Sequence, residues 1–158
     1  MPVRMTSLLN WRARNDTGEN NVRVTDKPIL LVEDDRVDAI AVIRALKEVH
    51  VENQIVLFEN GEEALNYLHD PTTQKPCIVL LDLNMPIMNG IEFLKALRDD
   101  ERLRRIPVVI LTTSDDPEDK LRCFNLGIAG YMPKPLGYIQ FVEVMKAIDA
   151  YWTLSQMP

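Results

Sequence analysis

CIVLLDLNMPIMNG, residues 77–90, is an apolar run that leads directly into one carboxylate, Asp82, and then into Pro86, Asn89 and Gly90. A short apolar run bounded by turn-forming residues is typical of a buried strand. A buried carboxylate is costly unless a partner compensates its charge. The stretch therefore predicts a buried strand that ends at an acid, and this acid must meet a partner.

The same pattern recurs along the chain, because each apolar run precedes a segment of helical period. The runs are ILLV (29–32), QIVLF (54–58), CIVLL (77–81), IPVVIL (106–111) and IAGYM (128–132), and the helical segments are 37–49, 62–68, 91–97, 118–126 and 136 to about 154. Continuous apolar strands that alternate with helices indicate a parallel sheet covered on both faces. We therefore expect an α/β fold with a doubly wound, five-stranded parallel sheet.

Several polar residues mark the expected helix ends. Asn60 and Asn89 each precede a helix and have a glutamate three residues later, which predicts a capping box. Pro117 suits a first helical position, and Gly127 suits a C-terminal cap. These residues need only a structural role.

Composition limits the possible functions. The chain has 158 residues and a net charge of −6, which argues against nucleic acid and anionic membranes as partners. No apolar run reaches the roughly 20 residues that cross a bilayer. Cys77 and Cys123 are expected to be reduced thiols of a cytoplasmic protein. We expect a flexible N-terminal extension over residues 1–26, a single domain over 27–158 with an extended C-terminal helix, and no attached output module.

Chemically active residues gather where the strands end. The first strand is followed by Glu33, Asp34 and Asp35, the third by Asp82, the fourth by residues 112–114, and the fifth leads to Lys134. In an open parallel sheet, ligands bind at the carboxyl ends of the strands. Crowded carboxylates repel one another unless a cation neutralises them.

A hard divalent ion fits this set of oxygens. Asp34 and Asp82, with a nearby backbone carbonyl, match Mg²⁺, which is usually bound by one or two carboxylates and phosphate oxygens. Zinc is disfavoured because the strand ends carry no histidine or cysteine. We therefore expect Asp82 to act as a nucleophile toward a phosphoryl group, with Lys134 and Thr112 contacting phosphoryl oxygens.

From about Pro28 to the C-terminus, the chain resembles the receiver domain of two-component response regulators. The matching residues are Glu33 and Asp34 as the acidic pair, Asp82 in LLDLNMPIMNG as the phosphoacceptor, Thr112 and Tyr131 as the switch pair, and Lys134 before Pro135. The resemblance implies a flavodoxin-like (βα)5 fold. It also implies a Mg²⁺ site made by Glu33, Asp34, Asp82 and the Asn84 carbonyl, and a cis peptide between Lys134 and Pro135.

The resemblance further implies a single-domain response regulator of a phosphorelay. Asp82 would accept a phosphoryl group from a histidine kinase, with a histidine phosphotransfer protein as another partner. The chain would not be a dedicated enzyme, although Mg²⁺-dependent self-phosphorylation and autodephosphorylation of Asp82 are expected. IDAYWTLSQMP (148–158) and TTSDDPED (112–119) are similar to regulators that accompany phytochrome-like histidine kinases.

Signalling is expected through the switch pair and the last helix. We expect Thr112 to move toward the phosphoryl group and Tyr131 to rotate inward. The last helix has one apolar stripe of Ile139, Val142 and Met145, and a second of Phe141, Val144, Ile148, Tyr151 and Trp152. One stripe should face the sheet, and the other predicts a homodimer or kinase-docking surface.

Three alternatives use the same elements. A phosphatase of the haloacid dehalogenase type would need a second acid at position 84, which is Asn84. A flavin binder of the flavodoxin type would find its phosphate repelled by residues 33–35. A third possibility, a receiver-fold interaction module that works without phosphorylation, is left open by the sequence.

Asp35 is expected to cap the first helix and not to bind the metal.

Overall fold

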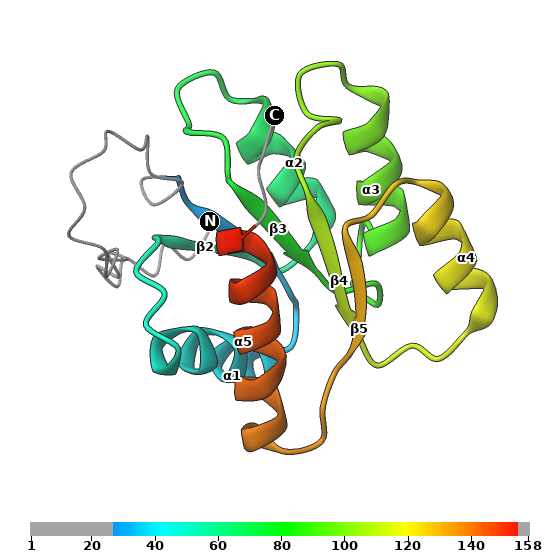
Figure 1. Ribbon diagram of the computed structural model, residues 1–158. Helices are drawn as coiled ribbons and strands as arrows, with labels where there is room; N and C mark the ends of the chain where they lie inside the picture. The colour runs from blue at the N-terminus through cyan, green and yellow to red at the C-terminus, as the bar shows by residue number, and fades with distance from the viewer. Residues whose placement is uncertain (1–26, 155–158) are drawn as a thin grey trace.

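The computed structural model describes residues 27–154 of the chain, with side chains described from 27 to 151. Strands and helices alternate throughout, and the strands form one parallel sheet in the order β2-β1-β3-β4-β5 (Figure 1). The expected doubly wound parallel sheet is confirmed. The expected N-terminal extension, residues 1–26, lies outside the described residues.

The elements follow the predicted pattern with small shifts at their ends. The strands are β1 (Ile29–Val32), β2 (Ile55–Phe58), β3 (Ile78–Leu81), β4 (Val108–Thr112) and β5 (Gly130–Pro133). The helices are α1 (Arg36–Glu48), α2 (Gly61–His69), α3 (Gly90–Asp99), α4 (Pro117–Asn125) and α5 (Tyr138–Leu154). The last helix begins two residues later than expected, because Leu136 and Gly137 belong to the connection that leads into it.

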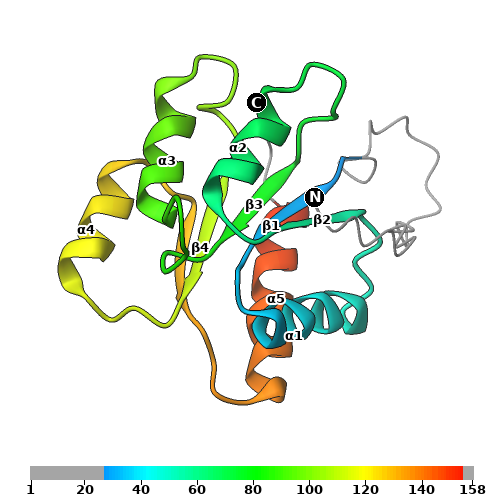
Figure 2. The same ribbon diagram turned by 180° about the vertical axis from the view of Figure 1, so that it is seen from behind.

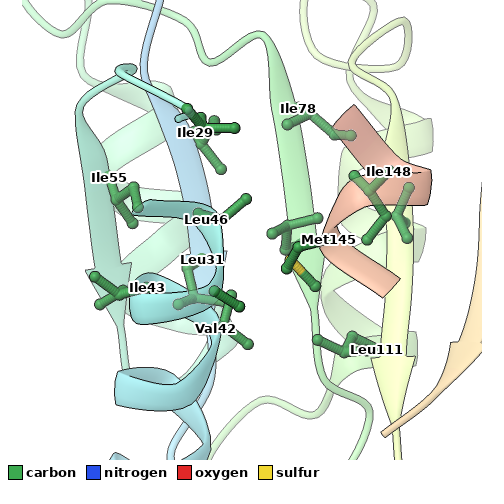
Figure 3. Close-up of a cluster of buried hydrophobic side chains, with 14 of the residues drawn as sticks. Ile29, Leu31, Val42, Ile43, Leu46, Ile55, Ile78, Leu111, Met145 and Ile148 are labelled. Carbon is green, nitrogen blue, oxygen red and sulfur yellow. The ribbon is translucent and has the colours of Figure 1, made fainter. Parts of the chain in front are cut away.

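Helices cover both faces of the sheet. One face carries α1 and α5, and the other carries α2, α3 and α4 (Figures 1 and 2). Successive strand residues point to opposite faces, so Leu31 packs with the α1 and α5 side while Leu30 and Val32 pack with the other. Figure 3 shows the buried cluster on the face covered by α1 and α5, where Val42 and Leu46 of α1 and Met145 and Ile148 of α5 meet strand residues.

The expected caps are present. The Asn89 side chain accepts a hydrogen bond from Glu92 N, and the Glu92 carboxylate accepts one from Asn89 N, which completes a capping box. Asn60 accepts a hydrogen bond from Glu63 N and so caps α2, but the reciprocal bond is not formed, so the predicted capping box is incomplete there. Pro117 occupies the first turn of α4, and Gly127 follows that helix at φ 70°. These residues therefore lie at the helix boundaries, as the sequence predicts.

The predicted division of the last helix into two stripes was wrong. Phe141, Val142, Met145 and Ile148 are buried together, so the inner face takes residues from both stripes. Ile139 is 75% exposed. The inner face follows spacings of three and four residues, from Phe141 to Met145 and from Val142 through Met145 to Ile148.

Two further expectations concern single residues. The Lys134–Pro135 peptide is not cis, contrary to what the resemblance implied. The trans form is also the intrinsically favoured one before proline. Cys77 and Cys123 are free and buried, which agrees with the expected reduced thiols.

Among the described residues, no helix combines the length and the apolar character that crossing a bilayer requires.

Candidate functional site

The sheet register places the strand-end residues side by side. Val32 of β1 pairs with Leu81 of β3, and the residue after Leu81 keeps the ladder because Asp82 N donates to Val32 O at 3.0 Å. On the far side, Lys134 N donates to Thr112 O at 2.8 Å. The strand order reverses between β1 and β3, which is where ligands bind in such sheets. The candidate site therefore lies over the carboxyl ends of β1, β3, β4 and β5.

Three carboxylates form one cluster at this edge. Glu33, Asp34 and Asp82 each present an oxygen, and these oxygens all lie within 4.8 Å of one another. Glu33 and Asp82 are buried, whereas Asp34 is exposed. Asp82 Oδ1 accepts a hydrogen bond from Leu83 N at 2.8 Å. The cluster is an all-oxygen set of the kind that Mg²⁺ and similar hard cations bind.

The partner of Asp82 is a lysine. Lys134 Nζ lies 3.5 Å from Asp82 Oδ2 and 2.5 Å from Glu33 Oε2, and the lysine side chain is 5% exposed. This ammonium provides the positive charge that a buried acid needs and that the sequence analysis predicts for Asp82. One ammonium among several acids still leaves the site negative.

The charges perturb one another. Burial raises the pKa of Glu33 to about 7, although the hydrogen bond from Lys134 opposes the shift, and the neighbouring charge of Asp82 adds to it. Burial alone would lower the pKa of Lys134, but hydrogen bonds to Asp38 and Glu33 outweigh it and raise that pKa above its ordinary value. Nearby carboxylates contribute to both shifts, although burial is the largest cause of the shift at Glu33. A dication bound beside Glu33 would oppose that shift.

The two residues of the expected switch pair are connected through Ser114. Thr112 is fully buried, and its Oγ1 accepts a hydrogen bond from Ser114 N at 3.1 Å. Tyr131 donates its hydroxyl hydrogen to Ser114 O at 3.1 Å. The Tyr131 ring stacks on Phe124 of α4, and Lys120 lies over the ring at 5.6 Å. The backbone of one residue therefore bridges the two side chains.

Asp35 takes the place expected of a cap. Its Oδ1 accepts from Val37 N and Asp38 N, so its carboxylate stabilises the start of α1. Asn84 is exposed in the loop after β3. Its predicted role as a carbonyl ligand stays a prediction.

Sequence reasoning missed Asp38. Its Oδ2 accepts a hydrogen bond from Lys134 Nζ at 2.9 Å. The position of Asp38 in the first turn of α1 could have identified it as a site residue. Helical side chains point back toward the N-terminus of their helix, and here that end faces the strand edge.

Comparisons with known proteins agree with this arrangement. The family model described as the response regulator receiver domain matches residues 29–146. The probable methanogenesis regulatory protein FilR2 of Methanothrix harundinacea is 37% identical over 127 residues, which cover 78% of this chain and 82% of FilR2.

Two cyanobacterial regulators are similar in sequence and structure. Response regulator Rcp1 of Synechocystis is 31% identical over 130 residues, covering 80% of this chain and 88% of Rcp1. Its Mn²⁺-bound crystal structure superposes with a TM-score of 0.77 at 30% identity, covering 84% of this chain and 99% of that one. The phosphorylated cyanobacterial phytochrome response regulator RcpA gives a TM-score of 0.78 at 33% identity, with the same coverage of 84% and 99%.

Proposed function

The chain belongs to the response regulator receiver domain family, and on that premise we propose that Asp82 accepts a phosphoryl group from the phosphohistidine of a histidine kinase. Receiver domains are signalling proteins and not dedicated enzymes. One observation carries the proposal: a buried carboxylate directly follows β3, with two further acids and the Lys134 ammonium within a few ångströms. A histidine phosphotransfer protein is a second donor of the same chemistry.

The transfer is an in-line substitution at phosphorus. An oxygen of Asp82 forms the new P–O bond while the P–N bond of phosphohistidine breaks, and the imidazole nitrogen keeps the electron pair. Lys134 pairs with a phosphoryl oxygen and offsets the added negative charge. Thr112 donates its hydroxyl hydrogen to another phosphoryl oxygen, since its bond to Ser114 N uses only the oxygen. Hydrolysis later returns Asp82 to the carboxylate.

The cluster is suited to holding Mg²⁺. Glu33, Asp34 and Asp82 supply carboxylate oxygens, and we propose that the Asn84 carbonyl adds a fourth ligand. The set fits the group because it contains only oxygen donors and carries more negative charge than Lys134 neutralises. The ion supplies charge neutralisation that brings a phosphoryl group to an acid. The Mn²⁺-bound structure of Rcp1 supports a divalent ion as the class of ligand.

The signal leaves the site through Ser114. If Thr112 moves toward the phosphoryl group, its hydrogen bond to Ser114 N changes, and the same residue accepts the hydrogen bond of Tyr131. Tyr131 then leaves Phe124 and rotates inward, which alters the surface of α4, β5 and α5. Only a two-state element of this kind converts one local charge into a surface change.

The proposal extends to partners. A phytochrome-like histidine kinase is the proposed donor, since Rcp1 and RcpA resemble the chain over most of their lengths and RcpA is a phytochrome response regulator. We place the pair in the cytoplasm. A homodimer is proposed because Leu121 and Phe124 of α4 and Tyr151 of α5 are large apolar residues that lie more than half exposed. Light scattering over a range of protein concentrations tests the dimer.

Intact-mass measurement tests the proposal. The chain is incubated with acetyl phosphate and Mg²⁺, and the expected result is a gain of one phosphoryl group that Asp82→Asn and metal chelation each abolish. If folded Asp82→Asn gains no mass, Asp82 is the acceptor and no other side chain takes the phosphoryl group.

The remaining alternative predicts another outcome. A receiver-fold interaction module that works without phosphorylation would show no mass gain with acetyl phosphate or with a phosphorylated histidine kinase. It would bind its partner equally well before and after incubation. That result would replace the phosphoryl-transfer proposal.

A further inference from the structure

Lys134 is shared unequally among three carboxylates. Its Nζ lies 2.5 Å from Glu33, 2.9 Å from Asp38 and 3.5 Å from Asp82. An ammonium has three hydrogen-bond donors, so it can serve three acceptors. The distances show that its short bonds go to the β1 and α1 side, whereas the pair with the proposed phosphoacceptor is long.

The two short bonds differ in how easily they can be released. The Glu33 side chain is 3% exposed, so losing its cation would leave a buried charge unpaired. The Asp38 side chain is 30% exposed, so water can solvate it when the lysine departs. The Asp38 bond is therefore the one that Lys134 gives up at low cost.

Asp38 is also separate from the acids that fit a metal ion. Within the described part of the chain, the cluster able to hold a cation comprises Glu33, Asp34 and Asp82 only. Asp38 is held in the first turn of α1, where its own backbone N–H donates to Asp35. Its carboxylate meets the site through Lys134 alone among the hydrogen bonds and ion pairs described.

We propose that Asp38 is a positioning residue that holds the Lys134 ammonium toward α1 and competes for it with a phosphoryl group on Asp82. This inference rests on the proposed function, since it concerns the same phosphoryl site. Phosphorylation then exchanges one anionic partner of Lys134 for another, and the carboxylate of Asp38 lowers the affinity of the site for the phosphoryl group.

Beryllofluoride, a phosphoryl mimic that binds an aspartate in the presence of Mg²⁺, measures this competition. Its dissociation constant is obtained by fluorine NMR titration for the unaltered chain and for Asp38→Ala, Asp38→Asn and Asp38→Glu. We expect Asp38→Ala to tighten binding about fivefold, the size of one partly exposed ion pair. Asp38→Asn should have a smaller effect in the same direction, and Asp38→Glu should keep the affinity of the unaltered chain.

Two controls separate positioning from general charge. Glu59 follows β2 at the same sheet edge and pairs with Arg36, so Glu59→Gln removes one negative charge without touching Lys134 and should leave affinity unchanged. In a Lys134→Met background, Asp38→Ala should have no effect, because the competition acts through the lysine. A merely structural role of Asp38 would persist in that background.

The outcomes are distinguishable. Beryllofluoride binding that is equal in the unaltered chain and in folded Asp38→Ala and Asp38→Asn would overturn the inference and leave the proposed function intact. Weaker binding in both variants would overturn it as well, since Asp38 would then assist Lys134. Absence of beryllofluoride binding by the unaltered chain would overturn the proposed function and the role of Asp38 together.

Discussion

Gly90 packs against the backbone of the residue proposed as phosphoacceptor. Its N–H donates to Leu83 O at 3.0 Å, and it is the first residue of α3. A Cβ at this position would collide with the Asp82 carbonyl oxygen and lie 2.8 Å from Leu83 Cα. The start of α3 therefore lies against the backbone that carries Asp82, and only glycine fits at residue 90 without a shift of that backbone.

Gly90→Ala should destabilise the protein, whereas Gly130→Ala should not. The first change forces backbone apart and should cost about 2 kcal/mol of unfolding free energy. A Cβ at Gly130 would meet only Val109 methyl groups at 3.8 Å and 3.9 Å, which is ordinary contact. Urea denaturation of both variants tests this, and equal midpoints would contradict it.

The two cysteines should be unreactive in the folded protein. Burial raises the pKa of Cys77 to about 12 and that of Cys123 to about 11, so few thiolates exist near neutral pH. A disulfide reagent at about pH 8 should therefore label neither thiol in the folded chain, although an unperturbed thiol would react. Both should react once urea is added. Rapid labelling without denaturant would contradict the structure.

At the scale of elements, α5 shows that a sequence pattern can predict a helix without predicting which of its faces is buried. The apolar composition of residues 136–154 predicts a helix but supports two inner faces. Packing selects the face of Phe141, Val142, Met145 and Ile148, because these residues meet α1 and the sheet together. Such a choice depends on the rotation of one helix against another, which the residues of that helix alone do not specify.

Met145→Ala and Ile139→Ala should therefore differ sharply. Met145 is fully buried, and its truncation should lower the unfolding free energy by about 3 kcal/mol because a cavity remains. Ile139 is exposed on the same helix, and its truncation should stay within about 0.5 kcal/mol. Thermal and urea unfolding provide the measurement. Comparable losses in the two variants would show that Ile139 is covered in solution.

At the scale of the whole molecule, the sheet determines how much of the site the sequence could predict. Asp82 and Lys134 lie together as predicted, and Thr112 ends the strand between theirs, because parallel strands bring their carboxyl ends to one edge. Asp38 was not predicted, because its contact depends on how α1 turns its first residues toward β5. The trans peptide before Pro135 was not predicted, because the cis expectation came from the family resemblance and not from the intrinsic preference of the peptide bond for trans.

Mg²⁺ should stabilise the folded protein. Binding to the folded state alone adds about 2.7 kcal/mol when the ion is at 100 times its dissociation constant. Urea unfolding with Mg²⁺ and with a chelator should show this difference, and Asp34→Asn should reduce it. Glu59→Gln, at the same edge but outside the cluster, serves as the control. A Mg²⁺ effect of the same size in Asp34→Asn would place the ion elsewhere.

The position of the modification tests the central claim most directly. After incubation with acetyl phosphate and Mg²⁺, borohydride reduction converts a phosphorylated aspartate to homoserine, which peptide mass spectrometry then locates. We predict homoserine at residue 82 alone, and none after incubation with a chelator. Homoserine at Asp34 or Asp38, or at no residue, would contradict the assignment of Asp82 as the phosphoacceptor.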